Sequence, residues 1–154
     1  MKLPPRKKTE SIINRKMKMN ILVQSLAIFS AVFVSFILGL KIFFVNEATP
    51  LTGARTMAFA TLILAELFRA YSARSEHVSV FKLGIFTNRS MNLAVSLSSL
   101  LLLLVIYIPV VNTIFDNVAL PLLSWIPILI LAVIPFSSSD IYKTIKYRKL
   151  YKDL

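Results

Sequence analysis

The chain has 154 residues, of which 56% are hydrophobic, and it contains three glycines and no cysteine. Soluble domains are about 45–50% apolar, so the excess indicates a protein that lies in lipid. The composition excludes disulfides, cysteine-ligated metals and a glycine-rich phosphate loop. The apolar residues form four blocks of a length that can span a hydrocarbon core about 30 Å thick. We therefore predict an all-α membrane protein with four transmembrane helices.

The net charge of +11 is distributed unevenly along the chain. Basic residues precede the first apolar block, surround the central connection and follow the last block, whereas the connections 43–53 and 111–119 contain no lysine or arginine. This alternation is the positive-inside pattern, which predicts that both termini are cytoplasmic. A nucleic-acid groove would not skip alternate loops, so we expect no nucleic-acid partner.

Residues 1–18 form a polar, basic lead-in, in which Pro4 and Pro5 exclude a regular helix. We expect this lead-in to stay cytoplasmic and uncleaved, because the block that follows has full spanning length. The first predicted span covers residues 19–43. It carries small residues, such as Ser35 and Gly39, that allow neighbouring helices to approach closely.

The second predicted span, residues 54–71, runs from outside to inside and carries Glu66. At about 1.5 Å per residue, Glu66 lies roughly 18 Å beyond Ala54, slightly past the bilayer midplane. A carboxylate at that depth is unfavourable unless it has a partner, which makes it a candidate functional residue. Arg69 lies three residues further along the same helix face and is a possible partner of Glu66. From the residues alone two roles stay open for Glu66: it is a ligand to a cation, or it forms an ion pair with Arg69 that only stabilises the helix bundle.

The central connection, residues 72–90, is predicted to be cytoplasmic and contains His77, which we interpret as a solvated loop residue rather than a metal ligand. Apolar residues from Val80 onward indicate a short amphipathic segment at the membrane interface. The third predicted span follows at 91–111, and Pro109 is expected to close it near the outer face.

The fourth predicted span, residues 120–136, opens beside Trp125, which is placed as an interfacial anchor would be. Residues 137–140, Ser-Ser-Ser-Asp, offer a helix N-cap, so we expect residues 141–154 to form a short basic helix that lies in the cytoplasm or at the membrane interface. The predicted organisation is a lead-in at 1–18, a four-span domain at 19–140 and a tail at 141–154.

Residues 56–76, TMAFATLILAELFRAYSARSE, resemble the eighth transmembrane helix and following loop of the P-type cation-transporting ATPases of the calcium-pump branch. Three shorter stretches resemble the same family in the right order. Residues 3–8 resemble its loop between helices six and seven, residues 103–109 the outer end of helix nine, and residues 134–140 the end of helix ten.

The resemblance implies a specific role for Glu66, because calcium pumps carry an acidic ligand to one of two calcium ions at that position. At position 69 the family usually has asparagine, and this chain has Arg69. A positive charge one turn away would repel a divalent ion or compete for Glu66. A metal-ligand role for Glu66, a Glu66–Arg69 pair and proton counter-transport are therefore rival expectations.

The family's phosphorylated Asp-Lys-Thr-Gly motif is absent from these 154 residues. The resemblance thus implies a C-terminal membrane-support portion, similar to helices seven to ten, that is not an enzyme and binds no cofactor on its own. The parent pump would use ATP, Mg²⁺ and a transported cation, which we expect to be Ca²⁺. We expect a product of a truncated or split pump gene in a bacterial plasma membrane, with lipid and the remaining pump helices as partners.

Two other functions stay open at the level of the sequence. One is an independent four-span carrier that exchanges protons through the buried Glu66. The other is a non-catalytic membrane subunit that binds a partner pump through its small-residue helix faces.

Overall fold

The structure, a computed structural model, describes residues 15–74 and 79–146, and every element in these ranges is helical. Most of the lead-in, His77 and residues 147–154 of the tail lie outside the described residues. The elements are α1 (Arg15–Leu38), which a π-helical turn (Gly39–Phe43) continues, α2 (Pro50–Ser72), α3 (Val80–Leu83), a 3-10 turn (Ile85–Thr87), α4 (Arg89–Tyr107), α5 (Pro109–Ile114), a second 3-10 turn (Leu122–Ser124) and α6 (Trp125–Lys146).

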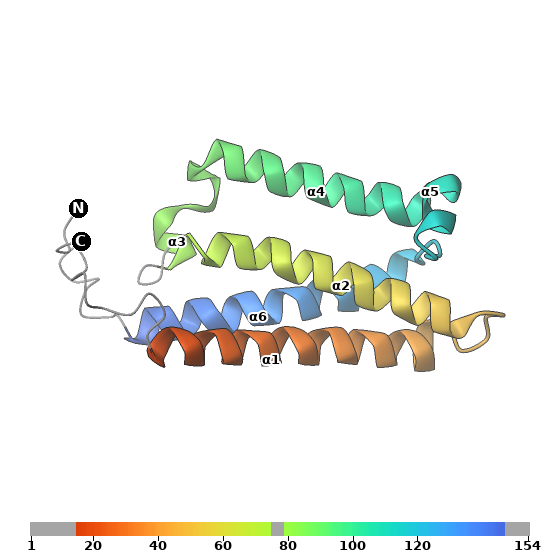
Figure 1. Ribbon diagram of the computed structural model, residues 1–154, viewed down its shortest axis with the longest axis horizontal. Helices are drawn as coiled ribbons and strands as arrows, with labels where there is room; N and C mark the ends of the chain where they lie inside the picture. The colour runs from red at the N-terminus through yellow and green to blue at the C-terminus, as the bar shows by residue number, and fades with distance from the viewer. Residues whose placement is uncertain (1–14, 75–78, 147–154) are drawn as a thin grey trace.

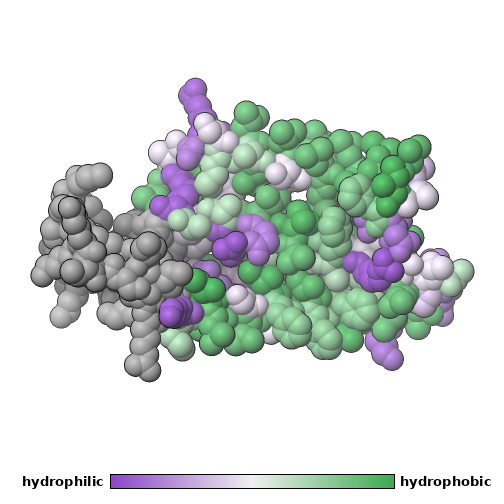
Figure 2. Space-filling model, viewed as in Figure 1, coloured by the Kyte–Doolittle hydropathy of each residue, from purple (hydrophilic) through white to green (hydrophobic). Residues whose placement is uncertain are grey.

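In the described ranges, four helices are long and apolar enough to cross a membrane, judged by length and composition: Ile21–Phe43, Pro50–Ser72, Arg89–Tyr107 and Leu122–Ile141. The prediction of an all-α chain with four such helices is confirmed, while the cytoplasmic placement of its termini stays a prediction. Hydrophobic side chains cover most of the visible surface in Figure 2, and hydrophilic side chains gather toward its two ends.

The helix at the centre of the packing is α2. It contacts both α1 and α6 along its length, and α1 and α6 also contact each other, whereas α4 lies at the edge of the bundle with fewer contacts (Figure 1). A far larger share of α2 is buried than of α1 or α4. Met57 and Ala60 of α2, Ile106 of α4 and Ile128 of α6 are fully buried in one hydrophobic core.

Small and hydroxyl-bearing residues bring α1 and α2 together. A Cβ atom added to Gly39 would lie 2.7 Å from the Ala54 Cα, so the two backbones touch where glycine leaves room. Further along the same interface, the fully buried hydroxyls of Ser35 and Thr61 are 2.7 Å apart, and each also lies within hydrogen-bond distance of the Met57 carbonyl. These contacts satisfy polar groups that lipid could not.

Two predicted boundaries are wrong. The third long helix ends at Tyr107, short of the predicted residue 111. Pro109 closes it as expected, because the residue before a proline, Ile108, is extended, and the same proline begins α5. The fourth continues through Pro135 to Lys146 as one helix, so residues 137–140 begin no new helix at residue 141. The Ser138 hydroxyl donates a hydrogen bond of 2.9 Å to the Pro135 carbonyl within this unbroken helix.

The bundle has two ends, which we name by their residues. The Phe44 end holds Phe44, Pro50 and Asp116, and the Asp140 end holds Ser72, Ser79 and Asp140. In Figure 1, α5 lies at the Phe44 end and α3 at the Asp140 end.

Candidate functional site

Glu66 lies close to the Asp140 end of α2. Because α2 ends at Ser72, six residues further on, the carboxylate is about 9 Å from the end of the helix at about 1.5 Å per residue. The helix also begins at Pro50, four residues before Ala54. Glu66 is therefore less deep in the spanning segment than its distance from Ala54 alone indicates.

The structure brings Glu66 and Arg69 together. The Arg69 Nε and Nη2 atoms both lie 2.7 Å from Glu66 Oε2, and Nε donates a hydrogen bond to it. The Arg69 side chain is 46% exposed and that of Glu66 is 42% exposed. Both contacts are to the same carboxylate oxygen, and among the described residues no donor contacts the other oxygen, Oε1. The arrangement neutralises the charge of Glu66 and keeps one oxygen available.

These two residues belong to a line of exposed or half-exposed side chains on α2, which we call the open stripe. The open stripe consists of Leu51, Arg55, Leu62, Glu66 and Arg69. The spacing of four, seven, four and three residues places all five on one side of the helix. In the described chain neither α1, α4 nor α6 covers this side, although it carries both ion pairs of α2.

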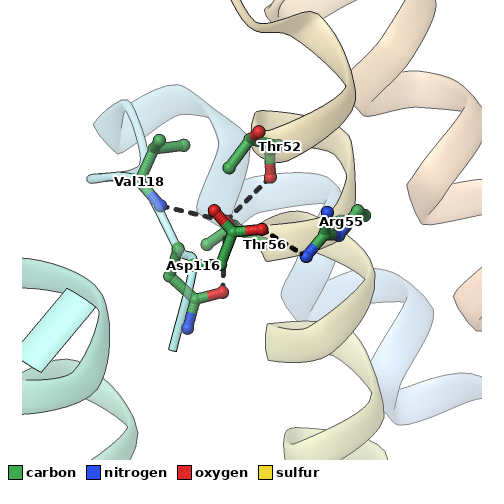
Figure 3. Close-up of polar contacts among 6 residues, drawn as sticks. Thr52, Arg55, Thr56, Asp116 and Val118 are labelled. Atoms are coloured by element: carbon green, nitrogen blue, oxygen red, sulfur yellow. Dashed lines mark hydrogen bonds and ion pairs between the residues drawn. The ribbon is translucent and has the colours of Figure 1, made fainter. Parts of the chain in front are cut away.

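The second ion pair lies at the Phe44 end, where α2 meets the loop after α5 (Figure 3). Arg55 Nη2 lies 2.6 Å from Asp116 Oδ2. Beside it, the buried Thr56 hydroxyl donates to the Thr52 carbonyl at 2.9 Å and accepts a hydrogen bond from the Val118 backbone N–H at 3.1 Å. Together these contacts fasten the loop to α2.

This cluster was not predicted from the sequence. Arg55 and Asp116 are 61 positions apart, so no local spacing rule connects them. The one local signal is the Asp-Asn pair at 116–117, which is typical of a turn with positive φ, and Asp116 has a φ of 52°.

We expect Thr56→Val to destabilise the Phe44 end more than Asp116→Asn does. Valine leaves the Val118 N–H without its acceptor, which should lower the free energy of unfolding by about 1–3 kcal/mol. Asparagine tolerates the same φ and removes only an exposed charge, whose pairing is worth about 0.2–1 kcal/mol. Unfolding of both variants in a denaturing detergent measures which of them is less stable. If Asp116→Asn is the less stable variant, the ion pair rather than Thr56 holds the loop.

Comparison with known proteins assigns the chain to a family. Residues 1–145 match the family described as "Cation transporting ATPase, C-terminus". The chain belongs to this family.

Several members of this cation-transporting ATPase family are similar to the chain over most of its length. It is 36% identical over 135 residues to the "Calcium-transporting ATPase" of Bacillus subtilis, a match that covers 88% of the chain and 15% of that protein. Identity is 33% over 155 residues to "Calcium-transporting ATPase 1" of Saccharomyces cerevisiae, covering 98% of the chain and 15% of that relative. The chain is 34% identical over 120 residues to "Calcium-transporting ATPase type 2C member 1" of Homo sapiens, a match that covers 78% of the chain and 12% of that relative. The chain thus matches about one seventh of the relatives' length.

For a member of this cation-transporting ATPase family, the arrangement of possible metal ligands is informative. In residues 15–74 and 79–146, no three His, Cys, Asp or Glu side chains gather into one group. Glu66, the predicted metal ligand, offers one oxygen, Oε1, beside its ion pair with Arg69. Calcium takes about six to eight oxygen ligands, so Glu66 is suited to supplying at most one part of such a site.

Proposed function

We propose that this chain is the C-terminal membrane-support portion of a calcium-transporting P-type ATPase. The observation that carries the proposal is the family match over residues 1–145, together with relatives whose names describe calcium transport. In this proposal the four long helices correspond to the last four membrane helices of the pump. ATP and Mg²⁺ act on parts of the pump outside this chain.

The open stripe of α2 is the surface that the other membrane helices of the pump would cover. Charged side chains inside a membrane-crossing segment are unfavourable against lipid and usually face protein or water. Glu66 and Arg69 are almost half exposed on a face that α1, α4 and α6 leave open. Packing of further helices on this stripe would remove both side chains from lipid.

Glu66 would then contribute one oxygen to the transported cation. Its Oε1 atom lies on the open stripe, whereas Oε2 is held by Arg69. Arg69 also lowers the affinity of Glu66 for a cation, because its positive charge next to the carboxylate opposes the approach of a divalent ion. We therefore propose Glu66 as a weakened ligand whose affinity is limited by Arg69.

The proposed orientation places the Asp140 end in the cytoplasm of a bacterial plasma membrane. Basic residues concentrate on both sides of that end, as the positive-inside rule requires. At the opposite end the Trp125 Nε1 donates to Tyr107 Oη at 2.7 Å, with the two rings stacked 6.4 Å apart. Paired aromatic rings of this kind are typical of a membrane interface.

A chimeric pump tests the proposal. In the Bacillus subtilis relative, the matching C-terminal region is replaced by residues 1–145 of this chain, and ATP-dependent uptake of radioactive calcium into inside-out vesicles is measured. We expect uptake. We also expect Glu66→Gln to lower the apparent calcium affinity and Arg69→Asn to raise it, because the competing charge is removed.

Each outcome of this experiment has a distinct meaning. A chimera that inserts in normal amount, hydrolyses no ATP and moves no calcium contradicts the support role. Calcium uptake with unchanged affinity in Glu66→Gln removes only the ligand role and leaves support intact. As a matched control, Leu62→Ala changes a neighbouring apolar residue of the open stripe and should leave calcium affinity unchanged.

A further inference from the structure

The segment at residues 79–87, which we call the aromatic loop, joins the Asp140 end of α2 to the start of α4. It contains α3 and the 3-10 turn Ile85–Thr87. Its exposure is strongly divided: Val80 is 1% exposed, whereas Phe81 is 68% and Phe86 is 83% exposed. Two large aromatic side chains are therefore mostly exposed within a few residues of each other.

The aromatic loop is fastened to α6 at a defined level. Asp140, itself 3% exposed, accepts a hydrogen bond of 2.5 Å from the Ser79 hydroxyl and one of 2.9 Å from the Val80 backbone N–H. The Phe81 ring also packs edge-on against Phe136, with centroids 6.1 Å apart. These contacts give α3 a capping carboxylate that comes from a distant helix, in addition to its own Ser79 cap.

The position of these contacts along α6 determines whether the two phenylalanine rings lie in water or at the surface of the bilayer. Phe136 and Asp140 both belong to the membrane-crossing stretch Leu122–Ile141, near its end. A loop that projected into the cytosol would not rest its first residues against that stretch. The aromatic loop instead lies beside the last turns of α6, where a bilayer changes from acyl chains to headgroups.

We propose that the aromatic loop is a membrane anchor, in which Phe81 and Phe86 insert among the lipids at this boundary and Asp140 is the positioning residue that sets their depth. Phenylalanine beside basic residues is typical of segments that lie in the interface plane. Arg74, whose Nη1 atom donates to the Gly84 carbonyl at 2.9 Å, and the exposed Arg89 supply positive charge on both sides of the loop. That charge complements anionic lipid headgroups. The aromatic loop would anchor the chain in this way whether or not the chain is part of a pump.

The chain has no cysteine, so single nitroxide labels can be attached at chosen positions of the full chain. Phe86→Cys reports on the aromatic loop, Leu100→Cys on the exposed middle of α4, and Glu47→Cys on an exposed loop. Each labelled chain is reconstituted in phosphatidylcholine–phosphatidylglycerol vesicles. Collision rates with oxygen, which prefers lipid, and with a water-soluble nickel chelate are then measured.

We expect the oxygen-to-nickel ratio at Phe86 to exceed that at Glu47 several-fold and to stay below that at Leu100. A ratio equal to that at Glu47 would place the ring in water and overturn the anchor. Exclusion of both reagents would place it against protein, which equally contradicts insertion into lipid.

The role of Asp140 is tested by Asp140→Ala in the Phe86-labelled chain. Alanine has no polar side-chain atom, so it removes the contacts to both the Ser79 hydroxyl and the Val80 N–H. We expect the ratio at Phe86 to fall at least twofold toward the Glu47 value, while the Leu100 label, which reports the folded bundle, stays unchanged. Ser138→Ala, an exposed neighbour on α6, is the matched control and should leave both labels unchanged. An unaltered ratio in Asp140→Ala would remove the positioning role.

Discussion

Replacing Gly39 with leucine should separate α1 from α2 and lower the free energy of unfolding by about 1–3 kcal/mol, the usual penalty for overpacking. A Cβ at this position would meet the Ala54 Cα at 2.7 Å and the Met57 Sδ at 3.2 Å. A side chain can rotate away, but the Ala54 backbone belongs to the most buried helix of the bundle and cannot move without disturbing its other contacts. Detergent-induced unfolding, followed by circular dichroism, measures the difference.

Ala94→Leu is the matched control for this substitution. Ala94 is exposed on α4, so the same added bulk meets no neighbour in the described chain and should change the stability by little. If Gly39→Leu proves as stable as Ala94→Leu, the two helices do not touch at Gly39.

Arg69→Leu should destabilise the chain in vesicles more than the double change Glu66→Leu/Arg69→Leu. The single change leaves a half-exposed carboxylate without its partner inside a membrane-crossing helix, whereas the double change removes both charges. An isolated charge costs about 2.5–3.5 kcal/mol at the centre of such a helix and less near its end, where Glu66 lies. Thermal unfolding of the reconstituted variants measures which of the two is less stable.

Ala70→Leu, at an exposed and uncharged position of the same helix, controls for a change in bulk. A double variant that is no more stable than Arg69→Leu would contradict the energetic coupling of the pair. In that case water or lipid headgroups would already satisfy Glu66 in wild type.

The four long helices could be predicted from the sequence because a block of about 20 apolar residues has few alternatives to a spanning helix. Their boundaries were less accurate where a proline could be interpreted in two ways. The second span was predicted to start at residue 54, but α2 begins at Pro50, a position that proline favours. Pro135 lies inside α6 without ending it.

The polar contacts that hold distant segments together could not be predicted from the sequence. Local rules predicted that residues 137–140 cap a helix at 141–154, which is wrong. The observed partner of Asp140, the Ser79 hydroxyl, is 61 positions away. Arg55 and Asp116 are separated by the same number of positions. Glu66 and Arg69, by contrast, are three residues apart, so helix periodicity alone was enough to suggest their contact.

The central position of α2 has a consequence for how the chain assembles. Of the four long helices, α2 has the lowest mean hydropathy, and it relies on α1 and α6 to cover its small and hydroxyl-bearing faces. In the order of synthesis α6 is made last, after α4, which contributes fewer contacts. The least lipid-compatible helix therefore keeps one flank uncovered until α6 has been synthesised. We therefore expect the bundle to complete its packing only after α6 is inserted, rather than by adding each span in turn to the one before it.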